Sequence, residues 1–113
     1  MEKIVEQGLL YDFYGELLTE HQKQIYEAAV YNDMSLTEIA DEHGISKQGV
    51  HDLIKRCTKT LQGYEDKLHM IRRFEAIKAQ AEELKKVSKK DLDVTELKKA
   101  ALDISENILE ELT

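Results

Sequence analysis

The sequence predicts an all-α fold, because it lacks turn-forming residues and because its apolar residues recur at helical spacing. Proline is absent from the 113 residues, and glycine occurs only five times. Since these two residues are the usual markers of turns, the chain is most simply a series of helices joined by short loops. Hydrophobic residues make up 42% and charged residues 35%, which is typical of a folded, soluble domain and not of a disordered chain.

The first half of the chain predicts three helices that lead up to a fourth. Apolar residues three and four positions apart indicate an amphipathic helix over residues 3–18. Two capping-box patterns follow, Thr19 with Gln22 and Ser35 with Glu38, and each predicts the start of another helix.

The second half predicts longer and simpler helices. Ser46 is expected to cap a helix that begins at Lys47, and beyond residue 62 the apolar residues recur at roughly 3.5-residue spacing. A lysine-rich linker then precedes a last helix, which Asp93 caps. We therefore expect a domain over residues 1–62 and a C-terminal helical extension over residues 63–113. The apolar seams of the extension predict a homodimer contact, although they would equally close a hairpin within one chain.

The sequence contains none of the patterns expected of a metal site, a cofactor site or an enzyme. The single cysteine, Cys57, excludes an internal disulfide and any zinc site that needs several thiolates. The four histidines, at positions 21, 43, 51 and 69, show no ligand spacing with Cys57 or with one another. No nucleophile elbow, phosphate-binding loop or zinc-protease motif occurs. We expect no catalytic residue and no bound cofactor.

Nothing in the sequence directs the chain to a membrane or out of the cell. No run of about 18 apolar residues is present, so no segment is expected to span a membrane. The N-terminus lacks the basic region and apolar stretch of a secretory signal. A cytoplasmic location is the expectation.

The motif with the clearest meaning is LTEIADEHGISKQGVHDLIK, residues 36–55. Ala40 is small enough for two helices to touch, and Gly44 tolerates the positive φ that a tight turn needs. Ile45 can insert from the turn into the core. Apolar residues continue in phase on both sides, at Ile39, Val50 and Leu53. These features together predict a helix-turn-helix.

The segment SLTEIADEHGISKQGVHDLIKRCTKTL resembles the DNA-binding region 4 of bacterial sigma factors. The longer run from Leu10 to Leu68 resembles the YlxM family, small helix-turn-helix proteins of Gram-positive bacteria encoded beside the signal recognition particle genes. The resemblance implies a sigma-region-4-like fold and a nucleic-acid-binding, regulatory role. It also implies a link to the signal recognition particle, through its RNA or its GTPase.

The second helix of the motif is expected to enter the major groove of DNA by its first turns. The exposed residues there are Ser46, Lys47, Gln48, His51 and Lys55. Gln48 suits adenine and Lys47 suits guanine. Arg56 and Lys59 are expected to hold phosphates.

Charge gives two opposing indications about this helix. Residues 46–59 carry four basic residues against one acidic residue, which favours binding to a polyanion. The whole chain, however, has a net charge of −7 and a pI near 5.1, so a local patch must act against the global field. Gly49 offers no side chain to a base, and Asp52 on the exposed face repels phosphates.

Two functions therefore remain open from the sequence. The first is a nucleic-acid-binding regulator, with DNA as its default target. The second is an accessory factor of the signal recognition particle that binds RNA or protein and uses the fold as a docking scaffold. Gly49, Asp52 and the net charge favour the second, whereas the basic stretch and the intact turn favour the first.

Overall fold

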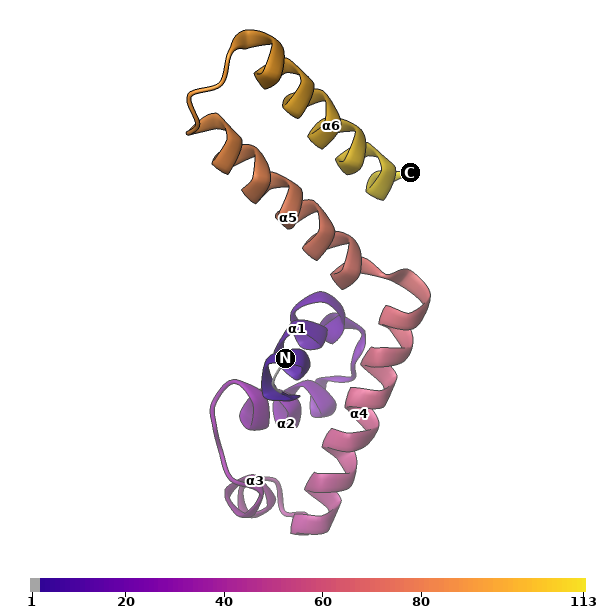
Figure 1. The fold of residues 1–113 in the computed structure, drawn as a ribbon. Coiled ribbons are helices and arrows are strands. Elements are labelled where there is room, and N and C mark those ends of the chain that lie inside the picture. Colours follow the sequence, from indigo (N-terminus) through magenta and orange to yellow (C-terminus); the bar gives the residue numbers. More distant parts are fainter. Residues whose placement is uncertain (1–2) are drawn as a thin grey trace. The chain divides into compact units, whose positions relative to one another are not determined.

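The computed structural model describes residues 3–113, which form α-helices joined by short loops with no strand among them (Figure 1). This confirms the all-α expectation. The elements are α1 (Lys3–Tyr14), the 3₁₀ helix η1 (Gly15–Leu17), α2 (Glu20–Val30), α3 (Leu36–His43), α4 (Lys47–Leu68), α5 (Met70–Ser88) and α6 (Val94–Leu112).

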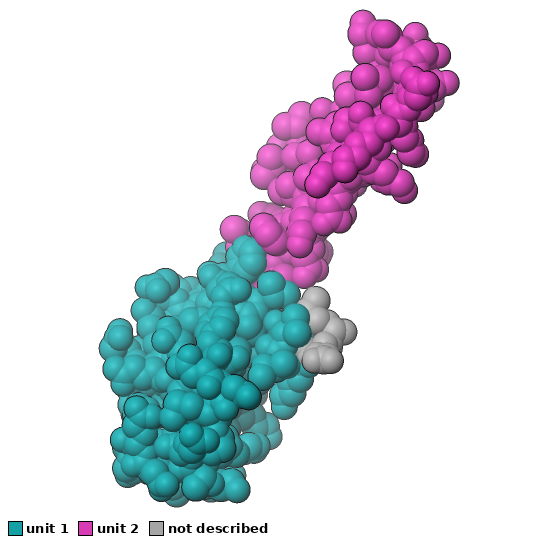
Figure 2. Space-filling model, turned by 90° about the vertical axis from the view of Figure 1, so that its left-hand side faces the viewer, with its two compact units in different colours: residues 1–69 teal, residues 70–113 magenta. Residues whose placement is uncertain are grey.

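The chain divides into two compact units, Met1–His69 and Met70–Thr113 (Figure 2). The boundary lies later than the expected one at residues 62–63. The reason is that α4 continues through Gly63 and ends only at Leu68, where His69 adopts a left-handed conformation with φ 56°. That these units are separate folding domains stays a prediction.

Side-chain caps start the helices of unit 1 where the sequence predicted them. Thr19 Oγ1 accepts from the Gln22 N–H at 3.3 Å, and Gln22 Oε1 accepts from the Thr19 N–H at 2.9 Å. Ser35 and Glu38 form the same reciprocal pair. These bonds satisfy N–H groups that have no partner within the helix.

The first helix is shorter than the sequence predicted. It ends at Tyr14 instead of residue 18, and Gly15–Leu17 tighten into η1. The ring of Tyr11 lies over Gly15 so closely that an added Cβ would meet its Cδ2 at 2.8 Å. A glycine is therefore required there, and its weak helix propensity favours the change to a tighter turn.

The core of unit 1 forms where α1, α2 and α3 pack on α4. Its fully buried side chains are Ile25, Tyr26, Ile39, Val50, Cys57 and Leu61. Burying an aliphatic side chain of this size contributes about 1.5–3 kcal/mol. Cys57 packs in the core as a small apolar residue, and its burial raises the pKa of its thiol.

Tyrosines hold α1 against α2. The Tyr11 ring stacks on Tyr26 with centroids 5.7 Å apart and meets Tyr31 edge-on at 5.6 Å. The hydroxyl of Tyr31 donates to Asp12. Burial and this carboxylate raise the pKa of Tyr31 to about 12, so its hydroxyl stays protonated and able to donate at neutral pH.

Unit 2 is a hairpin of the antiparallel helices α5 and α6 (Figure 1). Val87 and Ile104 are its buried side chains, and Asn107 Nδ2 donates to Gln80 Oε1 across the hairpin at 3.2 Å. Asp93 caps α6 by accepting from the Glu96 N–H, without the return bond of a full capping box. Five large apolar side chains of α6 remain more than 40% exposed: Val94, Leu97, Leu102, Leu109 and Leu112.

Substituting alanine at two glycines of unit 1 should change the free energy of unfolding in opposite directions. Gly44 has φ +65°, so Gly44→Ala should lower the free energy of unfolding by about 1 kcal/mol, the cost of a left-handed alanine. Gly63 lies within α4 with nothing within 4 Å of an added Cβ. Gly63→Ala should raise that free energy by about 0.5–1 kcal/mol. Urea unfolding of the two variants checks this, and shifts of the same sign would contradict it.

Candidate nucleic-acid interface

The predicted helix-turn-helix is present between Leu36 and Leu68. Gly44 ends α3 in the left-handed conformation, and the N–H groups of Gly44 and Ile45 both donate to the Ala40 carbonyl. Ala40 is buried and Ile45 is half-buried. Ser46 then begins α4 by accepting from the Gly49 N–H at 2.9 Å. This turn determines which face of α4 is buried and which is exposed.

The residues expected to touch nucleic acid all lie on the exposed side of α4 or at its cap. They are Ser46, Lys47, Gln48, His51, Lys55, Arg56 and Lys59. The structure divides most of them between two surfaces. Lys47, Gln48 and His51 border a shallow hollow with Leu36 of α3, whereas His51, Lys55 and Lys59 line a groove between α4 and α1. Ser46 and Arg56 line neither. Whether these side chains contact nucleic acid stays a prediction.

Asp52 engages two of the candidate base-reading side chains. Gln48 Nε2 donates to Asp52 Oδ1 at 2.9 Å, and His51 Nδ1 lies 3.6 Å from the same oxygen. The Gln48 amide is therefore already hydrogen-bonded on the surface of α4. To contact a base it would have to break this bond, which reduces the net free energy gained on binding. The carboxylate also places a negative charge in the middle of the cationic surface.

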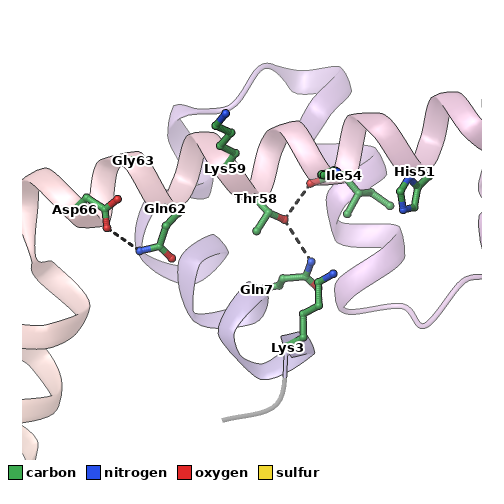
Figure 3. Close-up of a pocket in the computed structure, with 10 residues that line it drawn as sticks. Lys3, Gln7, His51, Ile54, Thr58, Lys59, Gln62, Gly63 and Asp66 are labelled. Atoms are coloured by element: carbon green, nitrogen blue, oxygen red, sulfur yellow. Dashed lines mark hydrogen bonds between the residues drawn. The ribbon is translucent and has the colours of Figure 1, made fainter.

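A groove of about 650 Å³ runs between α1 and α4 (Figure 3). Lys3 and Gln7 line it from α1. The α4 residues that line it are His51, Ile54, Lys55, Thr58, Lys59, Gln62, Gly63 and Asp66. Among the described residues that line the groove, three are lysines and one, Asp66, is acidic.

Thr58 is the point where three helices join at the floor of this groove. Its hydroxyl donates to the Ile54 carbonyl at 2.9 Å, which uses its one hydrogen. The Tyr26 hydroxyl therefore donates to Thr58 Oγ1 at 2.8 Å, and Gln7 Nε2 donates to the same oxygen at 3.3 Å. α1 and α2 are both tied to α4 at this side chain.

Sequence reasoning missed the α1 wall of the groove. Gln7 meets Thr58 across 51 positions of sequence, and no local pattern indicates such a contact. A partial signal exists, because Lys3 and Gln7 are four residues apart and so share one face of α1. The same spacing relates His51, Lys55 and Lys59 on α4.

The cations of unit 1 are concentrated at this interface. Residues 1–69 hold seven lysines and arginines against thirteen acidic residues. Lys23 pairs with Glu16 at 3.0 Å, away from the groove. Lys67 lies near the C-terminal end of α4, and the other five gather on the N-terminal part of α4 and the facing end of α1: Lys3, Lys47, Lys55, Arg56 and Lys59. None of these five forms an ion pair with another residue in the described range 3–113.

Among residues 3–113, no helix combines the length and the apolar composition needed to cross a bilayer.

Comparison with known proteins places this arrangement in a family. The family described as "Putative helix-turn-helix protein, YlxM / p13 like" matches residues 1–101. A UPF0122 protein of Acetivibrio thermocellus is 42% identical over 97 residues, which are 86% of this chain and 82% of that protein. One from Thermoanaerobacter sp. (strain X514) is 45% identical over 78 residues, 69% of this chain and 67% of the relative. One from Shouchella clausii is 38% identical over 91 residues, covering 80% and 84% respectively. The chain therefore belongs to the YlxM / p13-like family of helix-turn-helix proteins, UPF0122.

Proposed function

We propose that this protein binds nucleic acid through the exposed face of α4, with duplex DNA as its default target, and that it acts as a regulatory protein. The observation that carries the proposal is the gathering of five cations on α4 and the facing end of α1, in an otherwise acidic unit; none of the five forms an ion pair with another residue of the range 3–113. Cations that form no internal ion pair are available to replace the counterions of a phosphate backbone.

The geometry suggests a division of labour along α4. Lys47 and Gln48 stand in the first turn, where a helix-turn-helix contacts base edges. Lys55, Arg56 and Lys59 follow about two to three turns later and suit phosphates. Ser46 supports the surface as the cap of the helix. Most groups gathered here are cations and amides, which suit binding, so we propose a non-enzymatic role. We also propose a cytoplasmic location, as the sequence led us to expect.

A second function has a specific observation in its favour. Asp52 holds Gln48 at 2.9 Å and weakens the base-reading surface. A ligand recognised by its backbone and shape would be less affected than a DNA site read by its bases. An accessory role on the signal recognition particle, through its RNA or its GTPase, is therefore the alternative.

We further propose that unit 2 supplies a homodimer contact. Helix-turn-helix proteins commonly bind paired half-sites as dimers. Leu102 and Leu109 lie seven residues apart on α6 and are 59% and 58% exposed. Two such leucines on one helix face, beside Leu112, are typical of a helix–helix contact surface.

Removing the two first-turn side chains tests the reading of DNA. Lys47→Ala with Gln48→Ala should abolish the preference for duplex from the protein's own operon over a scrambled duplex, because the base contacts are lost. Fluorescence anisotropy measures both affinities. The control is Lys98→Ala with Lys99→Ala, two exposed lysines of α6. An unchanged preference in the α4 variant would refute groove reading.

Neutralising Asp52 should strengthen binding. Asp52→Asn removes one charge from the interface and leaves a carbonyl that can still accept from Gln48. We expect affinity for duplex DNA to rise roughly five-fold, corresponding to about 1 kcal/mol for one charge pair near water. Asp103→Asn in unit 2 makes the same change in net charge and should have little effect. Equal effects of both variants would mean that only net charge matters.

Charge on the exposed leucines tests the dimer. Leu102→Glu with Leu109→Glu should halve the mass measured by light scattering, because two carboxylates cannot be buried in an apolar contact. Leu17→Glu is the control, since Leu17 is 58% exposed in unit 1. A wild-type protein that is already monomeric, or a double variant of unchanged mass, would contradict this contact.

A further inference from the structure

The groove between α1 and α4 is a defined feature of unit 1 because hydrogen bonds connect its walls. Gln7 of α1 donates to Thr58 of α4, and Thr58 is in turn bonded to Tyr26, a fully buried residue of α2. The wall formed by α1 therefore has a set position against α4. This position brings Lys3, at the start of α1, to the same groove as Lys55 and Lys59.

The two lysines and the histidine that α4 contributes to the groove are spread along it and are not collected at one point. His51, Lys55 and Lys59 follow at intervals of four residues, so each lies about 6 Å further along α4 than the last. Three side chains then cover about 12 Å of one wall, and Lys3 stands on the other wall (Figure 3). A single small anion cannot contact such a row, whereas a chain of phosphates can.

The remaining polar side chains also suit a negatively charged chain. Gln7 and Gln62 contribute amides from opposite walls. Asp66 is the acidic lining residue, and it lies beyond Gln62, whose Nε2 donates to its Oδ1 at 2.9 Å. The described α4 residues that line the groove from His51 to Lys59 carry no carboxylate, although Asp52 lies beside His51 just outside this lining.

His51 belongs both to this groove and to the hollow beside Lys47 and Gln48. The groove therefore begins where the proposed base-reading surface ends. A nucleic acid strand whose bases contact the first turns of α4 could therefore place its backbone in the groove, so that the two surfaces contact one continuous strand.

We propose that the α1–α4 groove holds consecutive phosphates of one strand of the bound nucleic acid, and that Lys3 is a phosphate contact outside the helix-turn-helix. This rests on the proposed function and adds a second binding surface to it. The contacts are independent of sequence, because phosphates carry no base information.

The salt dependence of binding tests this assignment. We would measure the affinity of the wild-type protein and of the Lys3→Ala variant for a fluorescein-labelled DNA duplex of arbitrary sequence at several salt concentrations. Each lost phosphate contact lowers the slope of log affinity against log salt by about 1. Lys3→Ala should show this decrease, with equal weakening for the operon duplex and the scrambled duplex. Lys3 is exposed and forms no ion pair with another described residue, so the variant should fold, which circular dichroism checks.

Lys67→Ala is the matched control, because Lys67 is an exposed lysine of α4 that does not line the groove. Its slope should equal that of the wild type. A Lys3→Ala slope equal to that of Lys67→Ala would overturn the groove assignment while leaving the proposed function intact. Absence of salt-dependent binding by the wild type would overturn both. A third outcome would also overturn the groove assignment. If the affinity for labelled poly-glutamate equals that for DNA, and Lys3→Ala lowers both affinities equally, the groove binds an acidic peptide.

Discussion

The structure of unit 1 depends on one constraint: α4 must bury one face and present cations on the other along the same 22 residues. Val50, Leu53, Cys57 and Leu61 take the positions that meet α1, α2 and α3. The basic residues can occupy only the remaining positions of the helical repeat. Gly44 sets where α4 begins relative to α3, so the turn, the core and the exposed surface are determined together.

The rest of unit 1 is acidic, so the cationic face of α4 differs in charge from its surroundings. In the proposed binding mode, the acidic residues elsewhere would repel a polyanion and the cations of α4 and the start of α1 would attract it, which favours one mode of docking over others. Asp52 moderates that attraction from within, since it holds Gln48 and lies near His51. The arrangement favours a binding mode in which phosphate contacts contribute much of the affinity and base contacts are few.

The features that the sequence predicted are those with local causes. Capping at Thr19 and Ser35 and the turn at Gly44 each follow from residues a few positions apart. The early end of α1 follows instead from the Tyr11 ring over Gly15, which is visible only in three dimensions. The groove escaped prediction because Lys3 and Gln7 reach α4 across about half the chain. Asp52 was recognised as unfavourable, but its bond to Gln48 was not anticipated.

The exposed cations on α4 are proposed to bind a nucleic acid. The most direct test is fluorescence anisotropy of the unmodified protein with labelled duplex DNA from its own operon and with labelled signal recognition particle RNA, at low and at moderate salt. We expect saturable binding that weakens steeply as salt is raised, and the tighter ligand identifies the target class. Failure to bind either nucleic acid at low salt would contradict the account, and the helix-turn-helix would then serve as a scaffold for a protein partner.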